Sequence, residues 1–180
     1  MFRFGAAAAL MLLAAASVSA MDTAQLGNLH WRLVGPFRGG RTLAVTGDPS
    51  DAQHFYFGSV NGGVWETHDA GRTWQPIFDR ESVGSIGAIA LAPSNSKTIY
   101  VGTGEADMRS DISQGDGMYK SDDGGKSWTH IGLTDTQQIE RILVDPADAQ
   151  NVYVAALGHP YGPNDQRGVF ARREGGKTWQ

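Results

Sequence analysis

The sequence contains no cysteine and no excess of basic residues. Without thiols the chain forms neither disulfides nor thiolate metal sites. Its 15 lysines and arginines stand against 19 acidic residues, which gives a formal net charge of -4. A chain of this charge lacks the basic footprint of a nucleic-acid-binding protein. The two absences exclude a disulfide scaffold and predict that nucleic acid is not a partner.

The apolar run near the start of the chain is too short to span a membrane. It has eleven residues, from Ala6 to Ala16, whereas a spanning helix needs roughly 18 or more. Arg3 precedes the run, and Val18-Ser19-Ala20 follows it as a small-x-small cleavage site. We therefore expect residues 1–20 to be a secretory signal peptide.

Cleavage after Ala20 predicts the cellular location of the mature chain. Loss of Arg3 takes the formal charge from -4 to -5, and residues 21–28 become a short lead. We expect an exported bacterial protein, periplasmic or extracellular, that has no membrane span after cleavage.

Glycine is abundant, and it marks a repeated turn. An eight-residue pattern occurs at residues 67–74, 121–128 and 172–179, each copy with an acid, a glycine, a hydroxyl and a Trp at fixed spacing. A short carboxylate in such a turn accepts hydrogen bonds from backbone N–H groups, and glycine adopts positive φ without steric cost. Identical chemistry in every copy indicates a structural role rather than one reaction centre. The residues assigned to it are Asp69, Gly71, Thr73, Trp74, Asp123, Gly125, Ser127, Trp128, Glu174, Gly176, Thr178 and Trp179.

Three further anchors keep register with this turn: a proline, a tyrosine seven residues later, and an aromatic residue nine before the Trp. They are Pro49, Pro93 and Pro146, then Tyr56, Tyr100 and Tyr153, then Trp65, Tyr119 and Phe170. The spacing divides the chain into units 40–81, 84–136 and 137–180, each with four short apolar runs. A four-stranded meander repeating at about 50 residues is typical of a β-propeller blade.

Two segments need separate interpretation. Ile139, Ile142 and Leu143 have helical spacing, but the repeat register places them on the first strand of the third unit, which we prefer. Residues 29–35 copy a fourth strand without a preceding turn, which predicts an orphan strand that closes a ring. With under three complete units, we expect the front part of a longer propeller; a small three-unit fold is the alternative.

The turn S/T-x-D-x-G-x-T/S-W, as at residues 67–74 and 121–128, resembles the Asp-box or BNR repeat of β-propellers such as sialidases, xyloglucanase-type glycoside hydrolases and the sortilin luminal domain. The resemblance covers residues 29–180 and implies an all-β propeller. The third copy departs from it, with Arg172 and Glu174 in place of Ser/Thr and Asp. Gly62-Gly63-Val64-Trp65 and Gly102-Thr103-Gly104-Glu105 are similar to large secreted bacterial proteins of the glycosyl hydrolase or sortilin-like BNR type.

Two departures from these families concern activity. Xyloglucanases of this type place a catalytic Asp shortly before a Gly-Gly, where this chain has Val60-Asn61. Sialidases bind a substrate carboxylate through Arg in F/Y-R-I-P, and Phe37-Arg38-Gly39-Gly40 keeps half of that motif.

Candidate functional residues lie in the links of variable length. In a four-strand meander the links between second and third strands share a face with the links between blades, and variable loops on a fixed scaffold usually carry function. We expect Glu105, Asp107 and Asp111 as catalytic candidates on one flexible loop, in surroundings too wet to raise a carboxyl pKa strongly. The ligand-binding candidates are Arg38, Arg41, Arg109, His159, Tyr161, Asn164, Asp165 and Arg167.

Two function classes stay open at this point. Paired carboxylates are what glycoside hydrolysis needs, so the first is a carbohydrate-active or carbohydrate-binding propeller whose catalytic site needs further blades. The second is a non-catalytic propeller that binds a peptide or protein, like sortilin or photosystem assembly factors. We expect no cofactor and no metal ion, since His159 has no second histidine near it in the sequence.

Overall fold

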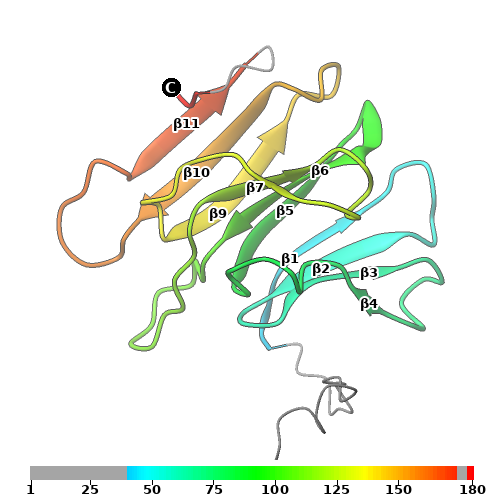
Figure 1. Cartoon of the computed structure of the whole chain (residues 1–180), viewed down its shortest axis with the longest axis horizontal. Coiled ribbons are helices and arrows are strands. Elements are labelled where there is room, and N and C mark those ends of the chain that lie inside the picture. The colour runs from blue at the N-terminus through cyan, green and yellow to red at the C-terminus, as the bar shows by residue number, and fades with distance from the viewer. Residues whose placement is uncertain (1–39, 174–177) are drawn as a thin grey trace, which may run out of the picture. The chain divides into compact units, whose positions relative to one another are not determined.

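The computed structural model describes residues 40–173 and 178–180, and these residues contain strands and no helix. The strands form three antiparallel sheets in chain order (Figure 1). The first sheet contains β1 (Thr42–Gly47), β2 (Phe55–Ser59), β3 (Gly63–Thr67) and β4 (Gln75–Pro76). The second contains β5 (Ile86–Ala92), β6 (Asn95–Thr103), β7 (Met118–Ser121) and β8 (Thr129–His130). The third contains β9 (Gln138–Val144), β10 (Val152–Gly158) and β11 (Gly168–Arg172).

Each sheet is a meander in which sequential strands pair, and this confirms the predicted all-β fold of propeller-type blades. The segment with helical spacing is strand β9, paired with β10 through Ile142 and Val154. The repeat register therefore outweighed the local periodicity. The expected signal peptide, lead, closing strand and Arg38 lie outside the described residues.

A fourth strand begins to form in the third sheet. Gln180 and Ala171 exchange backbone N–H···O hydrogen bonds of 3.0 and 2.8 Å. The pair matches Thr129 and Lys120 in the second sheet. Thr129 and Gln180 each directly follow the tryptophan of the repeated eight-residue turn, which is called the box turn here. Glu174 and Gly176, assigned to the third box, lie outside the described residues.

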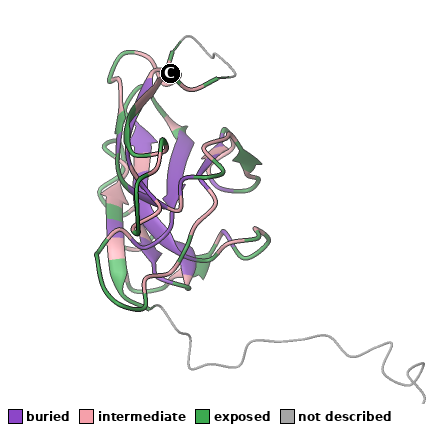
Figure 2. Cartoon of the chain, turned by 90° about the vertical axis from the view of Figure 1, so that its left-hand side faces the viewer, coloured by how far each residue is buried: buried purple, intermediate pink, exposed green. Residues whose placement is uncertain are grey.

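Neighbouring sheets pack face to face through two apolar clusters. Tyr56 and Val64 of the first sheet pack with Val101 and other residues of the second, and Tyr100 and Met118 of the second pack against the third. Buried strands accordingly occupy the middle of the assembly (Figure 2). The third sheet has Tyr153 at the same repeat position, and there it is 40% exposed.

The two described box turns are held by their carboxylates. Asp69 accepts hydrogen bonds from the Thr73 N–H at 2.8 Å and the Thr73 hydroxyl at 2.7 Å. Asp123 accepts the equivalent bonds from Ser127 at 2.9 and 2.6 Å. Gly71 has φ of 88°, a conformation that glycine adopts without strain.

The box turns lie beside the proline-containing links. Ala70 of the first turn donates its backbone N–H to the Gln53 carbonyl in such a link, and Gly124 of the second donates to the Lys97 carbonyl near the start of β6. The long loops between second and third strands therefore extend from the opposite ends of the strands.

The box carboxylates predict a specific acid sensitivity. Hydrogen bonds from the Thr73 N–H and hydroxyl lower the pKa of Asp69 to about 2, and those from the Ser127 hydroxyl and N–H lower that of Asp123 to about 2. An unfolded Asp titrates near about 3.9. A lowered pKa stabilises the fold above the unfolded value, so we expect this contribution to disappear as pH falls from about 4 to 2. Melting temperatures across that range measure it.

An Asp123→Asn variant should melt below the wild type at pH 6 and should lose less between pH 4 and pH 2. Asp165→Asn, which changes an exposed loop carboxylate, is the matched control and should follow the wild type. Parallel curves for Asp123→Asn and the wild type would contradict the role given to this carboxylate.

Candidate functional site

Two long loops from neighbouring blades meet on the face opposite the box turns. One connects β6 to β7 over residues 104–117, and the other connects β10 to β11 over residues 159–167. The Tyr161 hydroxyl donates a hydrogen bond of 3.3 Å to the Arg109 carbonyl. Between the loops lies a groove of about 420 Å³. It is lined by Ser110, Asp111, Ile112, Gln114, Gln137, His159, Pro160 and Tyr161.

The groove combines one accessible aromatic ring with polar side chains. Tyr161 is 63% exposed, and Asp111, Gln114 and Gln137 supply carboxylate and amide groups beside it. His159 is held in place by a bond of 2.8 Å between its Nδ1 and the Tyr161 carbonyl. Such a site offers an aromatic face for stacking together with hydrogen-bond donors and acceptors.

The remaining candidates of the second loop shape the loop itself. Arg167 donates to the carbonyls of Leu157 and His159 at 2.9 and 3.1 Å, and Asn164 donates to the His159 carbonyl at 3.0 Å. Asp165 is exposed. Arg167 and Asn164 therefore fix the backbone that presents His159 to the groove.

Glu105 does not lie in the wet surroundings that the sequence suggested. Its side chain is fully buried, with Oε1 2.5 Å from Arg41 Nη2 and 3.8 Å from Arg109 Nη1. Its Oε2 accepts the Ser113 N–H at 3.1 Å. The expectation of a wet loop carboxylate was wrong here because Arg41, 64 residues away in sequence, approaches from the first blade. In this arrangement Glu105 anchors the loop.

Asp111 is the opposite case, a carboxylate on the surface. Its side chain is 69% exposed, and its Oδ1 lies 2.6 Å from Arg109 Nε. The hydrogen bond from Arg109 holds the pKa of Asp111 below its ordinary value. Asp111 is therefore ionised at neutral pH and suits an acceptor of hydrogen bonds rather than a proton donor.

Asp107 lines a separate groove of about 340 Å³ near the inner strands. Glu140 and Arg141 of β9 line the same groove, together with Thr42 and Leu43 of β1. The structure thus brings Asp107 beside a second carboxylate from the next blade. Among the three catalytic candidates, Asp107 is the one that shares a groove with another acid.

Sequence reasoning missed two contributors to the larger groove. Gln114 and Gln137 were not singled out, although Gln137 directly precedes the first strand of the third blade. Its place in a link between blades was the available signal, because such links reach the same face as the long loops.

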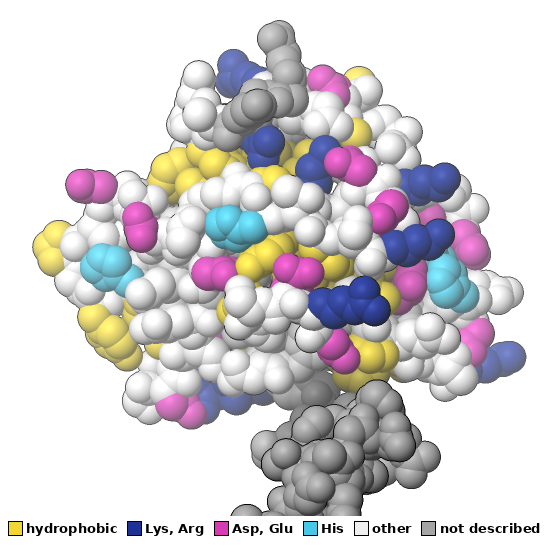
Figure 3. Space-filling view, viewed as in Figure 1, with side chains coloured by type: hydrophobic (Ala, Val, Ile, Leu, Met, Phe, Trp, Pro, Cys, Tyr) yellow, Lys and Arg dark blue, Asp and Glu magenta, His cyan; other side chains and the backbone are white. Residues whose placement is uncertain are grey.

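Charges of both signs are interspersed on the molecular face seen in Figure 3. The described residues show no basic stripe on that face, which agrees with the acidic formal charge of -4. No helix in the described part of the chain is long and apolar enough to cross a membrane.

Comparison with known proteins identifies xyloglucanases as relatives, although no protein-family model matches the sequence. The chain is 27% identical to the oligoxyloglucan-reducing end-specific xyloglucanase of Emericella nidulans, over 73% of this chain and 15% of that protein. It is 29% identical to a xyloglucanase of a Paenibacillus species, over 80% of this chain and 15% of that protein. The chain therefore spans about 15% of the length of both relatives.

Superposition on solved structures supports the propeller-type fold. An ancestral GH74 enzyme superposes with a TM-score of 0.63 at 26% identity, covering 83% of this chain and 19% of that one. YCF48 bound to D1 peptide superposes with a TM-score of 0.54 at 18% identity, covering 79% of this chain and 40% of that one. The likeness to YCF48 concerns the fold alone. The chain resembles a xyloglucanase-type glycosyl hydrolase propeller, as its sequence predicted.

Proposed function

We propose that this chain supplies polysaccharide-binding blades to an exported Asp-box propeller of the xyloglucanase type. The observation that carries the proposal is the groove of about 420 Å³ where the two long loops meet. Its exposed Tyr161 provides a flat apolar face for a sugar ring. Asp111, Gln114 and Gln137 provide acceptors and donors for sugar hydroxyls.

The similarity to two xyloglucanases supports the choice of ligand. Xyloglucan is a neutral chain, and a groove that joins an aromatic ring to two amides and one carboxylate suits such a ligand better than a polyanionic one. Arg109 is already paired with Asp111, so this arginine does not offer a free cation for an acidic sugar.

Binding should depend on the ring of Tyr161. We expect the full chain to bind xyloglucan oligosaccharides in isothermal titration calorimetry, and Tyr161→Ala to weaken binding by about tenfold or more, equivalent to about 1.4 kcal/mol. Tyr153→Ala is the matched control, because Tyr153 is an exposed tyrosine on the face of the third sheet. Equal affinity of Tyr161→Ala and wild type would remove this groove from the proposal.

Reducing-sugar release in the same samples separates a hydrolase from a binding module. Two carboxylates are needed for hydrolysis, and Asp107 with Glu140 is the pair that lines one groove. Reducing-sugar release that persists in the Asp107→Asn/Glu140→Gln double variant would exclude these two residues as the catalytic pair.

A peptide is the second candidate ligand, favoured by the fold shared with YCF48 in its peptide complex. The chemistry of the groove alone accommodates either ligand, since amides and a tyrosine also bind peptide groups. Binding of unstructured peptides at affinities that exceed those for oligosaccharides would favour this candidate.

A further inference from the structure

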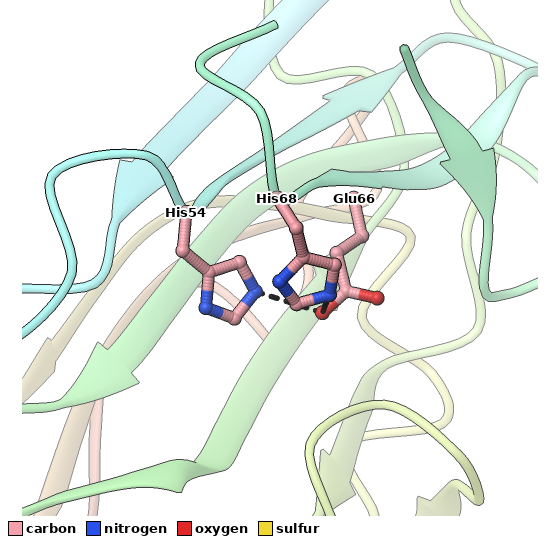
Figure 4. Close-up of side chains that lie close together, drawn as sticks. All are labelled: His54, Glu66 and His68. Atoms are coloured by element: carbon pink, nitrogen blue, oxygen red, sulfur yellow. Dashed lines mark hydrogen bonds and ion pairs between the residues drawn. The ribbon is translucent and has the colours of Figure 1, made fainter.

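Three metal-ligating side chains converge beside the first box turn, at the end of the blade opposite the groove. His54 directly precedes β2, Glu66 lies in β3 and His68 directly follows β3. Their ligand atoms all lie within 4.8 Å of one another. Figure 4 shows both imidazole rings beside the Glu66 carboxylate, with dashed lines from the rings to one of its oxygens.

The distances fit one small cation. Glu66 Oε1 lies 2.8 Å from His54 Nε2 and 3.3 Å from His68 Nε2. Tetrahedral zinc has bonds of about 2.0–2.2 Å to nitrogen and oxygen ligands, which places the ligand atoms about 3.3 Å apart. The ligand atoms of the two histidines lie within 4.8 Å of each other, so these side chains would shift by up to about 1.5 Å to reach that spacing around one ion.

A second carboxylate orients His54 from behind. Asp48 Oδ2 lies 3.4 Å from His54 Nδ1, and its side chain is 7% exposed. A metal-ligating histidine almost always donates its other ring N–H to a carboxylate, a carbonyl or water, which fixes the tautomer. Asp48 leaves Nε2 of His54 free to face Glu66. The ring of His54 also stacks on that of His68, with centroids 4.1 Å apart.

The cluster is not part of the repeating scaffold. The equivalent positions of the second blade hold Thr98, Lys120 and Asp122, and there Lys120 and Asp122 form an ion pair of 2.8 Å. The third blade has Asn151, Ala171 and Arg173 at these positions. Among the described blades, two imidazoles and a carboxylate meet in the first alone.

We propose that His54, Glu66 and His68 bind a divalent transition metal ion, Zn²⁺ above all, with Asp48 as the outer carboxylate. Imidazole ligands suit zinc, copper and nickel. The side chain of His68 is 65% exposed, whereas those of His54 and Glu66 are 12% and 14% exposed. The ion thus enters from the His68 side and keeps one coordination position for water or an external ligand. It fastens the start of β2 to the start of the box turn.

The test is a zinc titration of the full chain by isothermal titration calorimetry, with melting curves in parallel. We expect one Zn²⁺ per chain and a melting temperature that rises with zinc. Asp48→Asn should weaken zinc binding by about 10–100-fold, the usual effect of losing an outer-shell partner. His68→Ala should weaken it further, and its exposed position allows the fold to form without it.

His159→Ala is the matched control, because His159 lies on the opposite face in the loop 159–167. It should bind zinc as the wild type does, and Mg²⁺ should not compete, because Mg²⁺ prefers oxygen ligands in octahedral geometry. Absence of zinc binding by the wild type, or unchanged binding in His68→Ala, would overturn the proposal and reduce the cluster to a hydrogen-bond network.

Discussion

Trp128→Ala should lower the free energy of unfolding by about 3–5 kcal/mol, which corresponds to a melting temperature lower by about 10 °C in a chain of this size. Trp128 joins two blades. Its ring packs edge-on against Phe78 of the first blade with centroids 5.1 Å apart, and its Nε1–H donates to the Ile77 carbonyl at 2.8 Å. Truncation therefore leaves both a cavity and an unpaired acceptor between blades.

The same connection recurs one blade later, where the Trp179 Nε1–H donates to the Ile131 carbonyl at 2.7 Å. Ile77 and Ile131 each follow a box Trp by three residues, so the contact is a property of the repeat. Trp74 differs, because its Nε1–H bonds to the carbonyl of Gly71 in its own turn.

Two variants separate packing from hydrogen bonding at Trp128. Trp128→Phe retains an aromatic ring and loses the N–H donor, so we expect a smaller cost of about 1 kcal/mol. Tyr153→Ala, on the exposed face of the third sheet, should have little effect. Thermal or urea unfolding of the variants measures these differences. If Trp128→Ala unfolded at the same temperature and urea concentration as the wild type, the tryptophans would not connect the blades.

The fold was predictable because its information is local and repeated. Fixed offsets among proline, tyrosine and tryptophan determine which segment pairs with which, and they assigned Ile142 to a strand despite helical spacing. The register follows from the same anchors, since Phe57 pairs with Trp65 in the first blade and Val101 pairs with Tyr119 in the second.

That register also contained a signal that the sequence interpretation missed. Phe55 pairs with Thr67, so one step further along the hairpin His54 lies opposite His68. An alignment of strands two and three would have placed the two histidines together. Among the histidines only His159 was considered as a metal ligand, because nearness was judged along the chain rather than across the strands.

The surroundings of the loop carboxylates were not predictable in the same way. Glu105 and Asp111 are six positions apart on one loop, yet one side chain is fully buried and the other is 69% exposed. The difference arises from Arg41, which no repeat offset relates to Glu105. Loop conformation depends on such individual contacts, so the roles expected for the loop residues rested on their position in variable links alone.

Breaking the ion pair of Arg41 and Glu105 is the second change with a large expected effect on stability. The cost should depend on which of the two side chains is removed. Arg41→Met should cost about 3–5 kcal/mol, because it leaves a buried carboxylate without its main partner. The side chain of Glu105 is fully buried, and the remaining cation, Arg109, is 3.8 Å away. The Ser113 N–H at 3.1 Å does not neutralise the charge.

Glu105→Gln should cost less, about 1–2 kcal/mol. The Arg41 side chain is 50% exposed, so water solvates its charge when the carboxylate is gone. The glutamine also keeps an oxygen that accepts the Ser113 N–H. The double variant Arg41→Met/Glu105→Gln should recover part of the loss seen in Arg41→Met, because no buried charge remains.

Urea unfolding of the two single variants and the double variant measures these free-energy differences. The oligosaccharide titration measures whether the same variants change ligand affinity. Glu105 fixes the start of the loop that carries Asp111 and Gln114, so Glu105→Gln should weaken oligosaccharide binding through loop position. Asp107→Asn, at an exposed position of the same loop, should leave unfolding unchanged and serves as the control. If Glu105→Gln proved as destabilising as Arg41→Met, the difference in exposure between the two side chains would not control the stability of this ion pair.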